Sequence, residues 1–254
     1  MTSSQPIRAY MICTAPRSGS TLLCKLLAAT QSAGNPCSHF YSTSLAEWMD
    51  DYELEGDRFA SKQMALQAIL DAAIERGKGG TDVFGLRMQG GSFDFFLQPL
   101  GILFPECLND VDRIEAAFGP ILYIHLSRPD RLGQAISRVL AEQTGLWHRH
   151  SDGSEMERLA PPKEPRYDAR AIERYIAEAI AHDDAWEQWF AREGIDPIRI
   201  SYDALSKDPK AVLAQLLFAL NLDPAQAQYV EPPTAKLADA LSLKWRGQYE
   251  KSRD

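Results

Sequence analysis

The segment from Arg17 to Thr21 contains the residue types best suited to bind an anion. It reads Arg17-Ser18-Gly19-Ser20-Thr21 and lies between a short apolar run and a stretch rich in Leu and Ala. A strand-to-helix turn of this kind presents backbone N–H groups, and the N-terminus of the helix adds a partial positive charge. Gly19 lets the backbone approach a ligand closely, and Arg17 adds a fixed cation with several donors. The pattern therefore predicts an anion-binding turn.

The turn differs from the phosphate loop of ATPases and GTPases. Their pattern G-x-x-x-x-G-K-[ST] is absent, and no lysine precedes the Ser or Thr residues. A nucleoside triphosphatase with Mg²⁺ held in the usual way is therefore less well supported. The local pattern also fits a simpler alternative, an N-capped helix after a turn, because Ser and Thr favour that position as well.

A second candidate anion site lies around Arg128 and Ser137. Arg128 follows the apolar run 121–127, and open α/β sheets bind ligands at the carboxyl ends of their strands. Ser137 comes about two and a half helical turns later, so the two side chains could hold one phosphate. Gln134 lies on the same side of that helix as Ser137 and is expected to point toward the cleft. The alternative is a surface arginine beside an ordinary helix serine.

The elements that must position these residues follow an alternating pattern. Apolar runs at 8–14, 83–88, 121–127 and 198–202 predict buried strands. Helical periodicity is present at 21–29, 59–75, 129–146, 169–192 and 209–220. This alternation predicts an α/β fold in which helices cover both faces of a mostly parallel sheet.

Length and composition are those of a single domain spanning 1–254, with a flexible loop expected at 148–166 because this stretch is polar and contains three prolines. The net charge of −8 argues against nucleic acid as a partner. No apolar run is long enough to cross a bilayer, so no stable membrane insertion is expected. The four cysteines form no metal-binding pattern and are expected to be reduced, which favours a cytoplasmic location.

The string Pro16-Arg17-Ser18-Gly19-Ser20-Thr21-Leu22-Leu23 resembles the 5′-phosphosulfate loop of sulfotransferases that use 3′-phosphoadenosine-5′-phosphosulfate (PAPS). Over nearly its full length the chain resembles the bacterial family of trehalose, nodulation-factor and lipopolysaccharide sulfotransferases. The resemblance implies a three-layer, P-loop-like fold and PAPS as co-substrate, with no metal. It implies in-line transfer of a sulfuryl group to a hydroxyl of a carbohydrate or glycolipid acceptor. It also implies a possible homodimer.

The resemblance assigns roles to several side chains. Arg17 would act on the sulfuryl group and the leaving phosphate, while Ser18, Gly19, Ser20 and Thr21 would complete the 5′-phosphosulfate site.

At the other end of the nucleotide, the resemblance gives Arg128 and Ser137 the 3′-phosphate. Arg246 lies in a basic and aromatic segment, Lys244-Trp245-Arg246-Gly247-Gln248-Tyr249, that resembles a segment closing over the nucleotide in relatives. An exposed amphipathic tail is the alternative for this segment.

The general base is the place where the chain departs from the family pattern. In relatives the stretch that matches Gly34-Asn35-Pro36-Cys37-Ser38-His39-Phe40 reads Gly-Glu-Pro-x-Glu-Phe-Phe, and its second Glu is assigned as the base. Without a gap that Glu matches Ser38, and with one inserted residue it matches His39. Since imidazole has a suitable pKa for a base near neutral pH, His39 is the predicted base.

Four residues are expected on the acceptor side: Arg87 at a strand end, Gln134, and the aromatic residues Phe40 and Trp147, with His148 as a further sugar-bonding candidate. Two other functions remain open from the sequence. One is a small-molecule kinase with a degenerate phosphate loop. The other is a catalytically silent nucleotide-binding protein, which the missing Glu at the base position suggests.

Overall fold

A four-stranded parallel sheet forms the centre of the computed structural model, which describes residues 7–150, 152–231 and 240–252. Its strands are β1 (Ala9–Thr14), β2 (Phe84–Gln89), β3 (Ile121–Ser127) and β6 (Ile198–Ser201). Hydrogen bonds order them β2-β1-β3-β6, and every neighbouring pair is parallel. All four carboxyl ends therefore meet at one edge, and the predicted α/β fold with a parallel sheet is confirmed.

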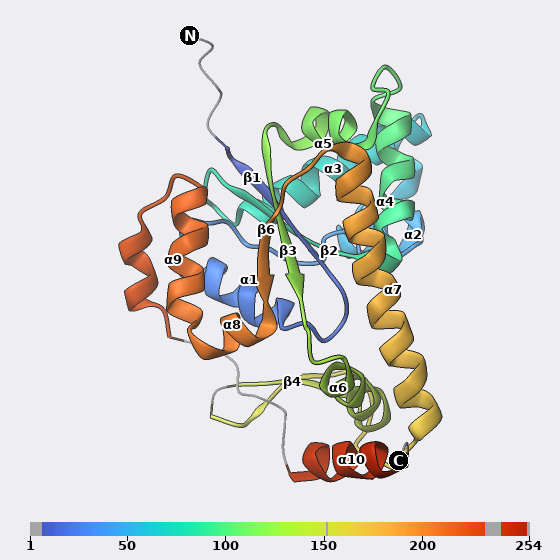
Figure 1. Ribbon diagram of the computed structural model, residues 1–254. Helices are drawn as coiled ribbons and strands as arrows, with labels where there is room; N and C mark the ends of the chain where they lie inside the picture. Colours follow the sequence, from blue (N-terminus) through green and yellow to red (C-terminus); the bar gives the residue numbers. More distant parts are fainter. Residues whose placement is uncertain (1–6, 151, 232–239, 253–254) are drawn as a thin grey trace.

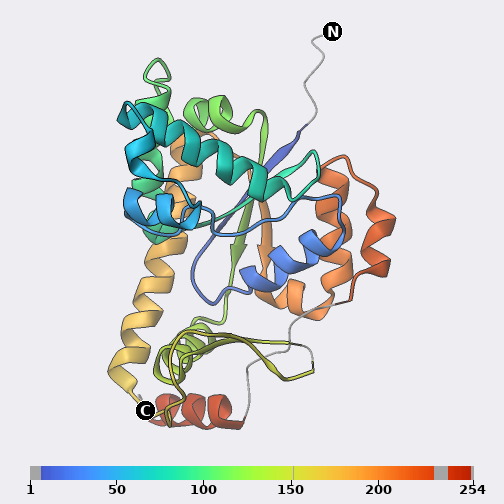
Figure 2. The ribbon, with the colours of Figure 1, turned by 180° about the vertical axis from the view of Figure 1, so that it is seen from behind.

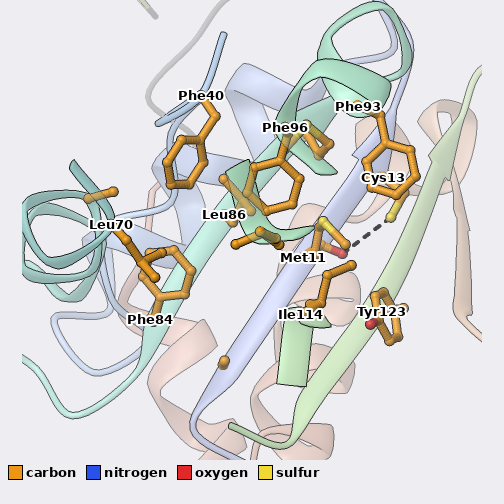
Figure 3. Close-up of a cluster of buried hydrophobic side chains, with 14 of the residues drawn as sticks. Met11, Cys13, Phe40, Leu70, Phe84, Leu86, Phe93, Phe96, Ile114 and Tyr123 are labelled. Carbon is orange, nitrogen blue, oxygen red and sulfur yellow. Dashed lines mark hydrogen bonds between the residues drawn. The ribbon is translucent and has the colours of Figure 1, made fainter. Parts of the chain in front are cut away.

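Strand β1 shows why the sheet is covered on both faces. Its six residues are all buried, and alternate side chains enter different hydrophobic clusters. Met11 and Cys13 join the cluster that contains Leu86 and Phe96, which Figure 3 shows in close-up. Tyr10 and Ile12 point to the opposite face. This period of two, with apolar residues on both sides, is typical of a central parallel strand.

Helices form a layer on each face of the sheet (Figures 1 and 2). One layer contains α1 (Ser20–Ala29), α8 (Tyr202–Lys207), α9 (Pro209–Ala219) and the 3₁₀ helix η2 (Pro224–Tyr229). The other contains α2 (Leu45–Asp51), α3 (Lys62–Lys78), α4 (Gly90–Leu103), α5 (Asp110–Phe118) and α7 (Ala169–Glu193), with a short 3₁₀ turn η1 (Gly56–Arg58) before α3. The three-layer arrangement is as predicted.

A further group of elements lies beyond the carboxyl ends of the strands, at the bottom of Figure 1. It comprises α6 (Arg131–Thr144), the hairpin of β4 (Leu146–Arg149) and β5 (Glu155–Arg158), and α10 (Ala240–Lys251). The hairpin occupies the first part of the segment 148–166, which was expected to be a flexible loop, and residues 159–168 contain no helix or strand. The segment around Arg246 is a helix that buries Trp245 and Tyr249 against α6 and α7, so it is not an exposed tail.

Helix α4 shows why some elements escaped the sequence analysis. It begins with Gly90 and Gly91 directly after β2 and contains Pro99, and all three residues disfavour a helix interior. Phe93 and Phe96 nevertheless bury one face of the helix in the aromatic cluster of Figure 3. Burial of such large side chains outweighs a loss in propensity of about 1 kcal/mol per glycine. Among the described residues, no helix has the length and apolar character needed to cross a membrane.

Candidate active site

The turn between β1 and α1 has the backbone of an anion-binding loop. Gly19 has a φ of +89°, and a Cβ there would lie 2.5 Å from Cδ2 of Tyr202, so both conformation and space favour glycine. No side chain caps the N-terminus of α1, which begins at Ser20. Its first N–H groups are therefore left for a ligand. Arg17 also has a positive φ, of 64°, which directs its side chain away from the regular path of the strand.

The hydroxyl of Ser18 supports this turn from within. It lies 2.5 Å from Thr14 Oγ1, and Thr14 in turn donates to the carbonyl of Leu126 on β3 at 2.8 Å. Ser18 and Thr14 are both fully buried. Ser18 therefore anchors the turn to the sheet, whereas Arg17, Gly19, Ser20 and Thr21 line the cavity beside it.

A cavity of about 1440 Å³ lies at the carboxyl edge of the sheet. Its lining combines the turn, the ends of β2 and β3, helix α6, the hairpin and α10. This volume exceeds the 300–1,000 Å³ of ordinary small-molecule sites. The cavity is therefore large enough for a nucleotide together with a second substrate.

The two anion motifs predicted from the sequence meet in this cavity. Arg17 Nε donates to Ser137 Oγ at 3.0 Å, and Arg128 Nη1 donates to the carbonyl of Arg17 at 3.3 Å. The guanidinium of Arg128 also stacks on the ring of Tyr202, and its buried Nε has no hydrogen-bond partner among the described residues. An unpaired buried donor of this kind is suited to an incoming acceptor such as a phosphate oxygen.

Helix α10 brings a further cation to the same cluster. Arg246 Nη2 lies 2.6 Å from both carboxylate oxygens of Asp130, which caps the N-terminus of α6. Arg128 Nη2 approaches the same carboxylate at 3.7 Å. Arg246 is thus positioned next to Arg128 by a shared acidic partner.

The electrostatics of the cavity are positive although the chain is acidic overall. Burial, with Arg128 and Arg138 nearby, lowers the pKa of Arg17 to about 10, so the group still carries its charge at neutral pH. Burial, assisted by Arg17, Arg87 and Lys25, lowers the pKa of His148 to about 3. A polyanion would offset the mutual repulsion of these cations. The charge distribution therefore favours a ligand with several negative charges.

Arg87 connects the turn with the segment that follows α1. It donates from Nη1 to Thr21 Oγ1 at 3.0 Å and from Nε to Ser38 Oγ at 2.8 Å. All three residues line the cavity. Ser38, the match to the family base in an alignment without a gap, therefore faces the cavity, and Arg87 lies beside it.

His39 lies outside the lining of the cavity. The ring is 5% exposed, its Nε2 is 3.2 Å from the carbonyl of Asn35, and burial lowers its pKa to about 4. The structure thus gives no support to the expectation that His39 is the base. Cys37 forms a bridge with Leu86, which places Ser38 and His39 on opposite sides of the extended segment.

Phe40 is also directed into the protein interior and not into the cavity. It is 3% exposed, and its ring packs at 5.1 Å from Trp48 and 4.9 Å from Phe96. Its role in the structure is to pack the core (Figure 3), which corrects the expectation that it stacks on a sugar.

Gln134 and Trp147 hold the turn from the side opposite the sheet. Gln134 is buried and donates to the carbonyl of Pro16 at 2.8 Å, so it positions the turn and does not line the large cavity. Trp147 lines the cavity, and its carbonyl accepts from Arg17 Nη1 at 2.8 Å. Its ring lies beside the guanidinium groups of Arg17 and Arg138.

Sequence reasoning missed Arg138 and Glu157, which also line the cavity. Arg138 is one helical turn beyond Gln134 and could have been found from the helix periodicity. Glu157 is recognisable only when the hairpin is known, because β5 places it opposite His148 of β4. Gln89, at the end of β2, is a third such residue, and its buried Oε1 lacks a partner within the described part of the chain.

Comparison with known proteins gives matches over nearly the whole chain. A model of the Stf0 sulphotransferase family matches residues 9–252. Trehalose 2-sulfotransferase of Mycobacterium tuberculosis is 30% identical over 274 residues, covering 97% of this chain and 96% of that protein. The trehalose 2-sulfotransferase of Mycolicibacterium smegmatis is 28% identical and covers 96% and 94%. Among solved structures, the sulfotransferase domain of the Synechococcus PCC 7002 olefin synthase matches 97% of this chain and 89% of its own, with 17% identity and a TM-score of 0.48.

Proposed function

Because the chain belongs to the Stf0 sulphotransferase family, we propose that it transfers a sulfuryl group from PAPS to a hydroxyl of a carbohydrate or glycolipid. The observation that carries this proposal is the single cavity shared by the turn of Arg17 and the pair Arg128 and Ser137. A nucleotide with phosphate groups at both its 3′ and 5′ positions needs two anion sites within one pocket. Two separate cavities would have spoken against it.

The residues of the cavity fit the donor. The uncapped N-terminus of α1 and the hydroxyls of Ser20 and Thr21 suit the 5′-phosphosulfate. Arg128, with its unpaired Nε, suits the 3′-phosphate together with Ser137 and Arg246. When bound, PAPS supplies the activated sulfuryl group, and the chain's own residues would orient it and balance its charge.

Positioning and charge stabilisation should account for most of the catalysis, by analogy with phosphoryl transfer. The acceptor oxygen attacks sulfur in line while the bond to the 5′-phosphate breaks, and negative charge develops on the leaving oxygen. Arg17 lies at the turn where that charge would appear, and it is held by Ser137 Oγ and the carbonyl of Trp147. A donor fixed in advance in this way stabilises the transition state without reorganisation.

Part of the cavity lining has groups that suit a sugar. Tyr41 lines it and is 68% exposed, so its ring is available as a platform. Gln89, with its unpaired Oε1, and Glu47 offer acceptors for sugar hydroxyls nearby. Since the curated relatives are named trehalose 2-sulfotransferases, trehalose is the first acceptor to test.

Ligand-induced thermal stabilisation tests the donor. Adenosine 3′,5′-bisphosphate should raise Tm more than AMP or ATP·Mg²⁺, because only it offers phosphates to both anion sites, and Arg128→Ala should remove the difference. Stronger stabilisation by ATP·Mg²⁺ would instead favour a kinase. Transfer of ³⁵S from labelled PAPS to trehalose and to a glycan panel then tests the reaction. Binding of the bisphosphate without any labelled product would favour a silent nucleotide-binding protein.

A further inference from the structure

The general base is the element of the reaction that the family pattern leaves open in this chain. Ser38, which matches the family Glu when the two stretches are aligned without a gap, lines the cavity, and a serine hydroxyl is too weak a base near neutral pH. His39 lies outside the cavity lining. The inference below rests on the proposed function and concerns which other group takes the proton from the acceptor hydroxyl.

Several titratable groups of the cavity are less suitable. Glu47 is exposed and its carboxylate bonds to Ser42, and Asp130 is held by Arg246. Glu178 and His182 line the cavity from α7, and within the described residues neither makes a hydrogen bond with the anion-binding turn. These positions leave His148 and Glu157 of the hairpin, which both line the cavity.

His148 reaches the anion-binding turn directly. Its Nε2 lies 3.0 Å from Thr21 Oγ1 and 3.5 Å from Glu157 Oε2, which is opposite it in the hairpin. Arg87 donates to the same Thr21 hydroxyl and also to Ser38. A continuous chain of contacts therefore joins the position of the family base to His148. The contact with Thr21 shows that Nε2 faces the side of the turn that lines the cavity.

The charges around His148 keep its ring neutral and able to accept a proton. Burial and the cations of Arg17, Arg87 and Lys25 lower its pKa to about 3. The carboxylate of Glu157 lies 3.5 Å from Nε2, and a negative charge at that distance favours the charged form of the ring. A bound polyanion offsets Arg17 and Arg87, which raises the pKa of His148 toward its usual value. The imidazole is then neutral at neutral pH and strong enough to act as a base.

We propose that His148 is the general base for the acceptor hydroxyl and that Glu157 stabilises the imidazolium that forms. The acceptor oxygen forms a bond to sulfur as its proton passes to the imidazole. The bond from sulfur to the 5′-phosphate breaks, and its electron pair stays on the phosphate oxygen. The products are the sulfate ester, adenosine 3′,5′-bisphosphate and an imidazolium, which then loses its proton to solvent.

The first test replaces the imidazole. His148→Gln keeps a polar contact with Thr21 but cannot accept the proton, so kcat with PAPS should fall by about 10²–10⁴. The kcat of the wild type should fall as pH drops through the pKa of His148 in the complex, and this acid limb should be missing from the residual activity of the variant. His150→Gln, an exposed histidine of the same hairpin segment, is the matched control and should keep the wild-type profile.

A second variant tests the pair. Glu157→Gln removes the negative charge 3.5 Å from Nε2 of His148, and since such a charge favours the imidazolium, the acid limb of kcat should move to lower pH. A weaker base should also lower kcat by about threefold to tenfold. An acid limb that stays in place would overturn the proposal, and this readout remains decisive if His148→Gln fails to fold. Stabilisation by adenosine 3′,5′-bisphosphate checks the fold of each variant.

Different results would contradict the base assignment and the proposed function. Full kcat in His148→Gln, or a change confined to the KM for PAPS with an unaltered pH profile, would contradict the base assignment and make His148 an anion ligand. A wild-type protein that transfers no label from PAPS to any acceptor would contradict the proposed function itself.

Discussion

The two walls of the cavity are built in different ways. The sheet wall consists of the turn at residues 15–20 and the ends of β2 and β3, which the central core holds in place. The cover consists of α6, the β4-β5 hairpin and α10, and of these α6 and α10 share a smaller hydrophobic cluster with α7. Arg17 joins the two walls through Ser137 and the carbonyl of Trp147. From this difference we expect the sheet wall to hold the donor and the cover to supply the group that takes the proton.

The largest effect is expected from a change at Arg17, which contacts both walls of the cavity. Arg17→Ala removes the cation from the turn, and loss of one preorganised donor alone costs about 10²–10³ in rate. Transfer should fall by at least that factor, while the fold persists because burial disfavours the charge that is lost. Initial rates with labelled PAPS measure the effect. Near-normal turnover would remove Arg17 from the reaction, and Arg8→Ala at the other end of β1 serves as control.

Arg128→Ala should give the next largest effect, on donor binding. Hydrogen bonds to charged groups contribute about 1.5–3 kcal/mol each, so the KM for PAPS should rise by roughly 10–100-fold with little change in kcat. The preference for adenosine 3′,5′-bisphosphate over AMP should disappear in binding assays. An equal loss for both nucleotides would show that Arg128 does not contact the 3′-phosphate.

Arg246→Ala tests the cover and should have a smaller effect. Arg246 is half-buried and paired with Asp130, and partly exposed pairs of this kind contribute about 1 kcal/mol or less. The KM for PAPS should rise by about threefold to fivefold. A rise in this KM as large as that expected for Arg128→Ala would contradict the difference between the two walls, because the cover would then hold the nucleotide as firmly as the sheet wall does.

His39→Gln should leave activity within about twofold of wild type and should change only the response of stability to acid. Folding lowers the pKa of His39 from 6.5 to about 4. The neutral ring of His39 therefore makes its full contribution to the free energy of unfolding above pH 6.5, and the wild type loses this contribution as pH falls toward 4. The variant should lack this loss, which amounts to roughly 3 kcal/mol. Urea unfolding at pH 7.5 and pH 4.5 measures the difference, and a large drop in kcat would restore His39 as a catalytic candidate.

The sheet wall was largely predictable from the sequence, whereas the cover was predictable only in part. The apolar runs and the turn at Arg17 are local signals, and the carboxyl ends of parallel strands must meet at one edge. In the cover, the helix that carries Ser137 was expected from its periodicity and Arg246 only from the resemblance. Glu157 was missed, because it reaches the cavity through the hairpin, which no local pattern indicated. The choice of general base depended on how the segment is aligned with the family pattern. One inserted residue shifts the match from Ser38 to His39, and these two side chains point to opposite faces of the extended segment.

The hairpin of β4 and β5 forms a sheet of its own and shares no backbone ladder with the central strands. Its length and sequence can therefore vary without altering the register of the parallel sheet, provided that the carbonyl of Trp147 still accepts from Arg17. Exchange of this hairpin between relatives would replace Trp147, His148 and Glu157 together. Such chimaeras would test whether the hairpin determines the choice of acceptor.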